Sequence, residues 1–185
     1  MTKFGELLRK NKDAVIQWWI DDTLATYSPD ATAAFKKQKD PFANPVGHSL
    51  RKGTRGIFEA LLDGTDAEEI RKNLYEIIKI RAIQEFSPSK AVGFVFRLKD
   101  AVREQLRRAG GEKQFSSDLA EFDGQVDRVA LAAFDIFVQC REQVSELRIN
   151  EVKRRVSWIM EKFNEGAPDP DVVPDESATK NVQGH

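Results

Sequence analysis

The last third of the chain has the pattern of one long helix. Between residues 111 and 166 there is no proline and only one glycine, Gly124. Apolar residues recur there in alternating steps of three and four, at Leu119, Phe122, Val126, Val129, Ala133, Ile136 and Cys140. This spacing places one apolar side chain per turn on one side of an α-helix. A helix over residues 117–164 would be roughly 70 Å long, so we expect one part to pack in a helical domain and the rest to meet a partner.

The apolar stripe of this helix changes phase near Leu147. Beyond that residue the apolar positions are Ile149, Val152, Val156, Ile159 and Phe163. The step of two from Leu147 to Ile149 rotates the stripe by roughly half a turn. We interpret the first stripe as part of a domain core and the second as a surface for a second copy of the chain or another protein. The basic cluster at residues 153–155 is interpreted as a solvated face, or else as a contact for an acidic partner surface.

The rest of the chain indicates further helices with clear boundaries. Ser28-Pro29, Asn44-Pro45 and Ser87-Pro88 each place a capping side chain before a proline, which is typical of a helix N-terminus. No segment alternates like a β-strand. The sequence therefore predicts an all-α, globin-like domain of six or seven helices over residues 1–148. It would be followed by the projecting end of the last helix at 149–165 and by an acidic, proline-rich tail at 166–185, expected to be disordered.

Three local details of the helical domain can also be predicted. One helix should cover residues 3–24, and another should cover residues 88–106. Gly93 would then lie inside the second of these helices, which often indicates a close helix crossing. Phe42 is expected to anchor its two-proline loop to the core.

Composition limits the classes of function. The chain has 185 residues, which suits one domain with a tail, and 32% of them are charged, which suits amphipathic helices with charged outer faces. A net charge of −1 argues against a dedicated nucleic-acid-binding protein. The N-terminus lacks the features of a signal peptide, and no uncharged run reaches membrane-spanning length. We therefore expect a cytoplasmic protein with no nucleic-acid partner and no membrane insertion.

No set of reactive side chains indicates an enzyme or a metal site. The histidines are His48 and His185, and Cys140 is the sole cysteine, which together are too few and too scattered for a zinc site. No Ser-His-acid set and no glycine-rich phosphate loop is evident. Cys140 lies on the apolar stripe and is interpreted as a small buried hydrophobic residue. We expect no catalytic residues, no metal and no cofactor.

A small ligand pocket is the remaining chemical possibility. Its candidate residues are Trp18, Phe58, Arg81, Gln84 and Phe94. The aromatic residues among them are more often simple core. Arg81 precedes the Ser87-Pro88 turn, and we interpret it as bonding backbone carbonyls at that corner, with ligand binding as the alternative. Because Trp18 and Trp19 are adjacent, one should enter the core and the other should lie at a boundary.

Four phrases in the middle of the chain form a recognisable set. They are residues 40–47 (DPFANPVG), 57–62 (IFEALL), 78–89 (IKIRAIQEFSPS) and 91–96 (AVGFVF). Together they resemble the N-terminal domain of RsbR/RsbRD-type co-antagonists of the stressosome, over roughly residues 5–145. The resemblance implies a non-haem globin fold, usually dimeric, that acts as a sensory or protein-interaction module. Haem is not expected, because residues 66–85, which would carry the proximal ligand of a globin, contain no histidine.

The resemblance also implies an output domain, which we do not expect in this chain. In full-length members the long last helix leads into a STAS domain, which a kinase binds and phosphorylates. Here only the tail follows residue 164, so we expect a stand-alone domain, and the kinase-binding surface cannot be carried over.

The leading hypothesis is a non-enzymatic regulatory or sensory module in stress signalling. It would form a homodimer and bind a regulatory protein partner through the second stripe of the long helix. The alternative is a small-molecule or cofactor-binding accessory subunit of an enzyme complex. An enclosed pocket with convergent polar groups would favour that alternative.

Overall fold

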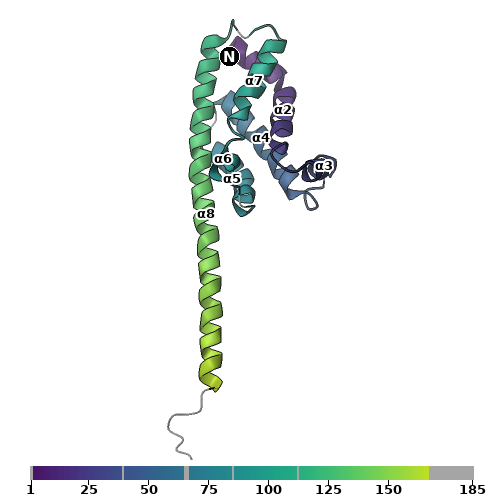
Figure 1. Ribbon diagram of the computed structural model, residues 1–185. Helices are drawn as coiled ribbons and strands as arrows, with labels where there is room; N and C mark the ends of the chain where they lie inside the picture. Colours follow the sequence, from purple (N-terminus) through teal and green to yellow (C-terminus); the bar gives the residue numbers. More distant parts are fainter. Residues whose placement is uncertain (1, 39, 65–66, 85, 112, 167–185) are drawn as a thin grey trace, which may run out of the picture. The chain divides into compact units, whose positions relative to one another are not determined.

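The protein is all-α in the part of the chain described by its computed structural model, residues 2–38, 40–64, 67–84, 86–111 and 113–166. Eight helices lie in these ranges: α1 (Lys3–Lys10), α2 (Lys12–Leu24), α3 (Pro29–Lys37), α4 (Pro45–Asp63), α5 (Ala67–Ile83), α6 (Pro88–Val92), α7 (Arg97–Arg108) and α8 (Ser116–Gly166) (Figure 1). The predicted all-α fold with a long C-terminal helix is confirmed, and α8 has 51 residues. The tail predicted to be disordered lies, from residue 167, outside the described residues.

The chain divides into two units, residues 1–144 and residues 145–185. We call them the first unit and the second unit. The first unit contains α1 to α7 and the beginning of α8, and the second contains the rest of α8. The boundaries that the sequence predicts, at residues 148 and 165, stay predictions.

The three predicted cap-and-proline signals each begin a helix. Ser28, Asn44 and Ser87 cap α3, α4 and α6, and in each case the following proline is the first helical residue. Asn44 shows the geometry best, since its side-chain oxygen accepts a hydrogen bond from the Gly47 amide at 2.8 Å. These starts were predictable because a cap depends on side chains within three residues of the helix end.

The loop before α4 is anchored differently from the prediction. Phe42 is 97% exposed, so the expectation that it plugs into the core is wrong. The buried Asn44 holds the loop instead, because its amide nitrogen donates to the carbonyls of Phe35 at 2.8 Å and Gln38 at 2.7 Å. A buried amide with several backbone partners fixes a loop without any apolar anchor.

The predicted helix over residues 3–24 is interrupted at Asn11. Its side-chain amide donates to the Leu7 carbonyl at 2.9 Å, and its backbone φ of −104° and ψ of 15° depart from helical values. Asparagine competes in this way with the regular helix hydrogen bonds. The segment therefore folds as α1 and α2.

The predicted helix over residues 88–106 is also interrupted, after Gly93. Tight turns follow, in which Val95 donates to the Val92 carbonyl at 3.0 Å and Leu98 donates to the Val95 carbonyl at 3.1 Å. A Cβ atom at Gly93 would lie 2.6 Å from the Ser89 carbonyl oxygen. Gly93 is thus required by the end of α6 and not by a close helix crossing, which corrects the sequence-based interpretation.

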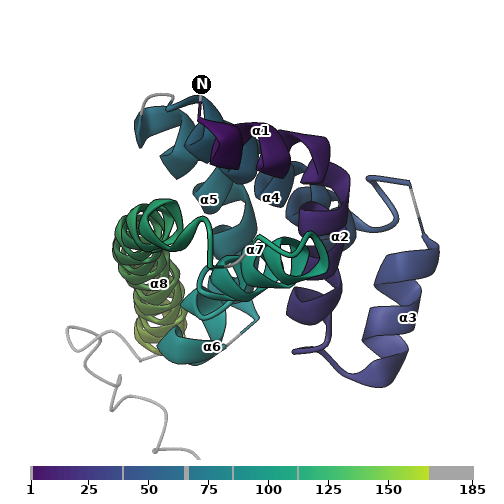
Figure 2. The same cartoon turned by 90° about the horizontal axis from the view of Figure 1, so that it is seen from above.

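The core of the first unit lies between α2, α4, α5, α7 and the beginning of α8. Figure 2 shows α7 between α2 and α8. The first apolar stripe of α8 faces this core, as predicted: all of its members are buried, namely Leu119, Phe122, Val126, Val129, Ala133, Ile136 and Cys140. Ion pairs reinforce the contact of α7 with α8, from Lys99 to Asp127 at 2.6 Å and from Arg103 to Asp123.

The two adjacent tryptophans separate as predicted. Trp19 is fully buried, stacks on the Phe94 ring with centroids 5.9 Å apart, and donates its indole N–H to the Phe94 carbonyl at 2.6 Å. Trp18 is only partly buried, and the Arg97 guanidinium lies over its ring at 5.7 Å. Because the helix is interrupted after Gly93, the Phe94 carbonyl can accept this hydrogen bond from the indole N–H.

Candidate functional site

The second unit carries an exposed apolar stripe on α8, which we call the C-terminal stripe. It consists of Ile149, Val152, Val156, Ile159 and Phe163. Their exposed fractions range from 45% at Ile159 to 76% at Phe163. Isolated apolar side chains on a surface are ordinary, but a contiguous set at helical spacing is typical of an interaction surface. These are the residues that the sequence predicts for contact with a partner or a second copy, and that role stays a prediction.

The charges beside the C-terminal stripe are mainly basic. When this part of α8 is divided into heptads, Ile149 and Val156 both occupy core position a. Lys153 and Arg155 then occupy positions e and g, which flank the apolar core of a helix pair. Glu151 is on another face of the helix, where its carboxylate accepts hydrogen bonds from Arg155 at 2.9 Å and Arg154 at 2.5 Å. The bond from Arg155 is the main reason that the pKa of Glu151 is lowered.

Arg81, a predicted pocket residue, is buried at the corner between α5 and α6. Only 1% of its surface is exposed. One guanidinium nitrogen, Nη1, donates to the carbonyls of Lys90 at 3.0 Å and Ala91 at 3.5 Å. These carbonyls are near the end of α6, where helix carbonyls lack partners of their own. The interpretation that Arg81 bonds backbone carbonyls at this corner is confirmed.

Aromatic rings surround the Arg81 guanidinium. Its central carbon lies 5.0 Å from the ring centroid of Phe94, 5.2 Å from that of Phe86 and 5.5 Å from that of Tyr27. Burial lowers the pKa of Arg81, and the neighbouring Tyr27 opposes that shift. The other terminal nitrogen, Nη2, has no hydrogen-bond partner among the described residues. Cation–π contacts therefore take the place of a counter-ion within the described part of the chain.

The other predicted pocket residues are dispersed around this corner. Phe58 and Phe94 are buried in the core, whereas Gln84 is exposed and accepts a hydrogen bond from the Tyr27 hydroxyl at 3.3 Å. Trp18 lies at the surface beside Arg97. The structure thus brings Arg81 and Phe94 together, leaves Trp18 partly buried at the edge of the core and leaves Gln84 exposed.

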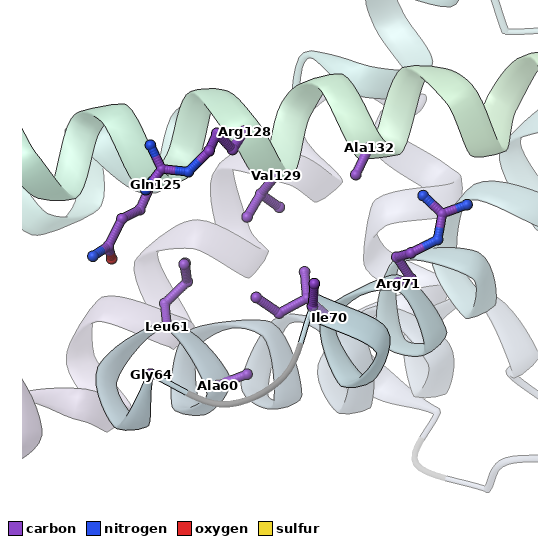
Figure 3. A pocket seen from close by; sticks show the side chains of 10 residues that line it. Ala60, Leu61, Gly64, Ile70, Arg71, Gln125, Arg128, Val129 and Ala132 are labelled. Carbon is purple, nitrogen blue, oxygen red and sulfur yellow. The ribbon is translucent and has the colours of Figure 1, made fainter.

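A groove that the sequence did not predict lies in the first unit, with the end of α4 and the start of α5 on one side and the beginning of α8 on the other. Its volume is about 360 Å³. Figure 3 shows Leu61 and Ile70 opposite Val129, with Arg71 reaching toward α8 near Ala132. Gln125 and Arg128 lie toward the other end of the groove. Residues far apart in sequence form it, and none of them stands out by type or spacing, so local patterns could not have indicated it.

Reactive groups are scarce within the described residues. No three histidine, cysteine or acidic side chains gather there as a metal site would require. Cys140 is buried, which raises the pKa of its thiol, and His48 is exposed. Within the same residues, no helix combines the length and the hydropathy needed to span a membrane.

Comparison with known families agrees with this arrangement. Residues 13–152 match the family described as the RsbT co-antagonist protein RsbRD N-terminal domain, which covers most of the chain. The chain belongs to this family. The family is one of regulatory domains in stress signalling and not of catalytic domains. The matched residues include all of α3 to α7 and all of α2 except its first residue.

One curated relative is 22% identical over 143 residues, covering 76% of this chain and 84% of its own length. It is an uncharacterized protein of Archaeoglobus fulgidus. No solved structure matches the chain.

Proposed function

We propose that this chain is a non-enzymatic regulatory module that acts by binding other polypeptides through α8. The observation that carries the proposal is the C-terminal stripe, whose apolar side chains are exposed in the second unit. Its two heptads have the spacing of a helix that pairs with another helix. Membership in a family of regulatory domains supports the same class of function.

Charge favours an acidic helix of another polypeptide as the occupant of the C-terminal stripe. If two copies paired through this stripe, Lys153 and Arg155 of one copy would lie close to the same cations of the other copy. Like charges that face each other across an interface are unfavourable. An acidic amphipathic helix matches the stripe in both its apolar face and its charge. We therefore assign the stripe to a partner protein and not to a second copy.

A separate face of α8, in the first unit, suits a second copy of the chain. Leu131, Phe134 and Val138 are exposed there at steps of three and four. Arg128 and Asp135 flank them, so a second copy would meet charges of both signs and not a uniform like-charged surface. We call these three residues the dimer face, and the resemblance to usually dimeric domains supports the assignment.

Sedimentation velocity at micromolar concentration distinguishes the two surfaces. We expect the wild-type chain to sediment as a dimer and the variant Leu131→Gln/Phe134→Gln/Val138→Gln as a monomer, because three exposed apolar contacts are lost. Glutamine retains helix propensity, so the helix itself should persist. The matched control is Val152→Gln/Val156→Gln/Ile159→Gln, which should remain dimeric. A monomeric wild type would contradict the dimer, and dissociation of the control alone would place the second copy on the C-terminal stripe.

The groove of the first unit is the observation that favours the alternative function, an accessory subunit that binds a small molecule. A ligand site is compatible with a regulatory module, because the ligand could be its signal.

A further inference from the structure

The groove beside α8 combines apolar walls with cations. Its walls are Leu61 and Ile70 on one side and Val129 and Ala132 on the other. Its volume of about 360 Å³ is at the lower end of the roughly 300–1,000 Å³ that small-molecule sites occupy. All of the groove residues belong to the first unit, and none is part of the C-terminal stripe.

The polar side chains of the groove have no partners within the described part of the protein. Arg71, Gln125 and Arg128 form no hydrogen bond or ion pair with any described residue. Other arginines of the first unit are engaged: Arg97 pairs with Asp22, for example, and Arg103 pairs with Asp123. The groove is therefore a place where guanidinium groups remain available beside apolar surface.

A partly buried guanidinium is well suited to bind an oxyanion. Arg71 is partly buried and reaches across the groove toward α8 (Figure 3). Its planar donors can bind a carboxylate or a similar group through two hydrogen bonds. The apolar walls would exclude water from a hydrophobic body attached to that group. Arg128 and Gln125, toward the other end, offer further donors.

We propose that this groove binds a small organic anion that consists of an oxyanion group, such as a carboxylate, attached to a hydrophobic moiety. Neither part of such a ligand would suffice alone. A simple anion would leave Leu61, Ile70 and Val129 in contact with water, and a neutral apolar molecule would leave Arg71 without a partner. The proposal does not depend on the partner protein, because none of the groove residues belongs to the C-terminal stripe or to the dimer face. Arg128 lines the groove and also flanks the dimer face.

The test is a titration of the full chain with 4-phenylbutyrate, followed by amide chemical shifts in NMR. We expect saturable shifts centred on the residues of the groove. The neutral analogue 4-phenylbutan-1-ol and inorganic phosphate each supply one half of the ligand, and both should bind at least about tenfold more weakly.

Variants locate the site and its charge requirement. Arg71→Gln should weaken 4-phenylbutyrate binding about five- to tenfold, since a charge-assisted hydrogen bond is lost from a partly screened position. Its matched control is Lys72→Gln, which removes the same charge from the next, exposed residue of α5 and should leave the affinity unchanged. Ala132→Trp should abolish binding by filling the groove, while circular dichroism confirms the helical fold.

Four results would overturn the inference. They are the absence of saturable shifts, equal affinity for the alcohol or for phosphate, equal loss in Arg71→Gln and Lys72→Gln, and unchanged binding in a folded Ala132→Trp variant. None of these results affects the sedimentation test of the dimer face, so failure of the ligand site and failure of the interaction module are distinguishable.

Discussion

Replacing Arg81 by alanine is expected to lower the free energy of unfolding of the first unit by about 3–4 kcal/mol. The substitution leaves a cavity between three aromatic rings and removes the donor to the carbonyls of Lys90 and Ala91. The buried Ala91 carbonyl and the partly buried Lys90 carbonyl would then lose this donor, which adds to the cost of the cavity. Urea denaturation followed by circular dichroism measures the change.

The matched control for this prediction is Arg81→Met. Methionine fills much of the same volume without a charge, so it removes the cost of burying a cation that has no counter-ion among the described residues. We expect it to lose about 1 kcal/mol or less, because that relief offsets the lost hydrogen bonds. Equal destabilisation by alanine and methionine would show that the charge itself, and not the packed volume, holds the corner between α5 and α6.

The largest effect on binding is expected from Val152→Gln/Val156→Gln/Ile159→Gln. Its affinity for an acidic helical probe should fall at least about 100-fold, because burial of each aliphatic side chain contributes about 1.5–3 kcal/mol. The probe is a synthetic peptide of three heptads with isoleucine and leucine at the core positions and glutamate beside them. Fluorescence anisotropy of the labelled peptide, titrated with the full chain, gives the affinity.

Two controls make this prediction specific. A peptide of the same pattern with lysine in place of glutamate should bind much more weakly, because Lys153 and Arg155 would repel it. The stability of the first unit should be unchanged in the triple variant, since the substituted side chains are exposed. If the variant unfolded, the C-terminal stripe would be core and the proposed partner surface would be wrong.

The parts of the fold that were predictable depend on short-range patterns. The caps at Ser28, Asn44 and Ser87 require only the neighbouring residues, and the burial of the first α8 stripe follows from steps of three and four. The separation of Trp18 from Trp19 follows from helical geometry alone. Such features do not depend on which helix packs against which.

The features that were missed depend on tertiary contacts or on weak local competition. The interruption after Gly93 is coupled to the burial of Trp19 against Phe94, which is 75 residues away in sequence. The exposure of Phe42 could not be foreseen, because the buried amide of Asn44 anchors the loop in its place. Asn11 was overlooked because one asparagine within a helical pattern is a weak signal.

The candidate site was predictable in part for the same reasons. The C-terminal stripe was found from its spacing, and its exposure in the second unit is the new information. Arg81 was found because an arginine in an apolar helix is unusual. The groove was not found, because Leu61, Arg71 and Val129 come from three helices and become neighbours only in the folded chain.

The central claim is that the first stripe of α8 belongs to the core and that the C-terminal stripe binds a partner. Hydrogen–deuterium exchange of the full chain, with and without the glutamate peptide, tests this claim. We expect the amides of residues 119–140 to be protected in both conditions, because their stripe belongs to the core of the first unit. The amides of residues 149–163 should exchange faster in the free chain and become protected when the peptide is added. Protection of residues 149–163 that does not change with the peptide would contradict a partner surface on the second half of the helix.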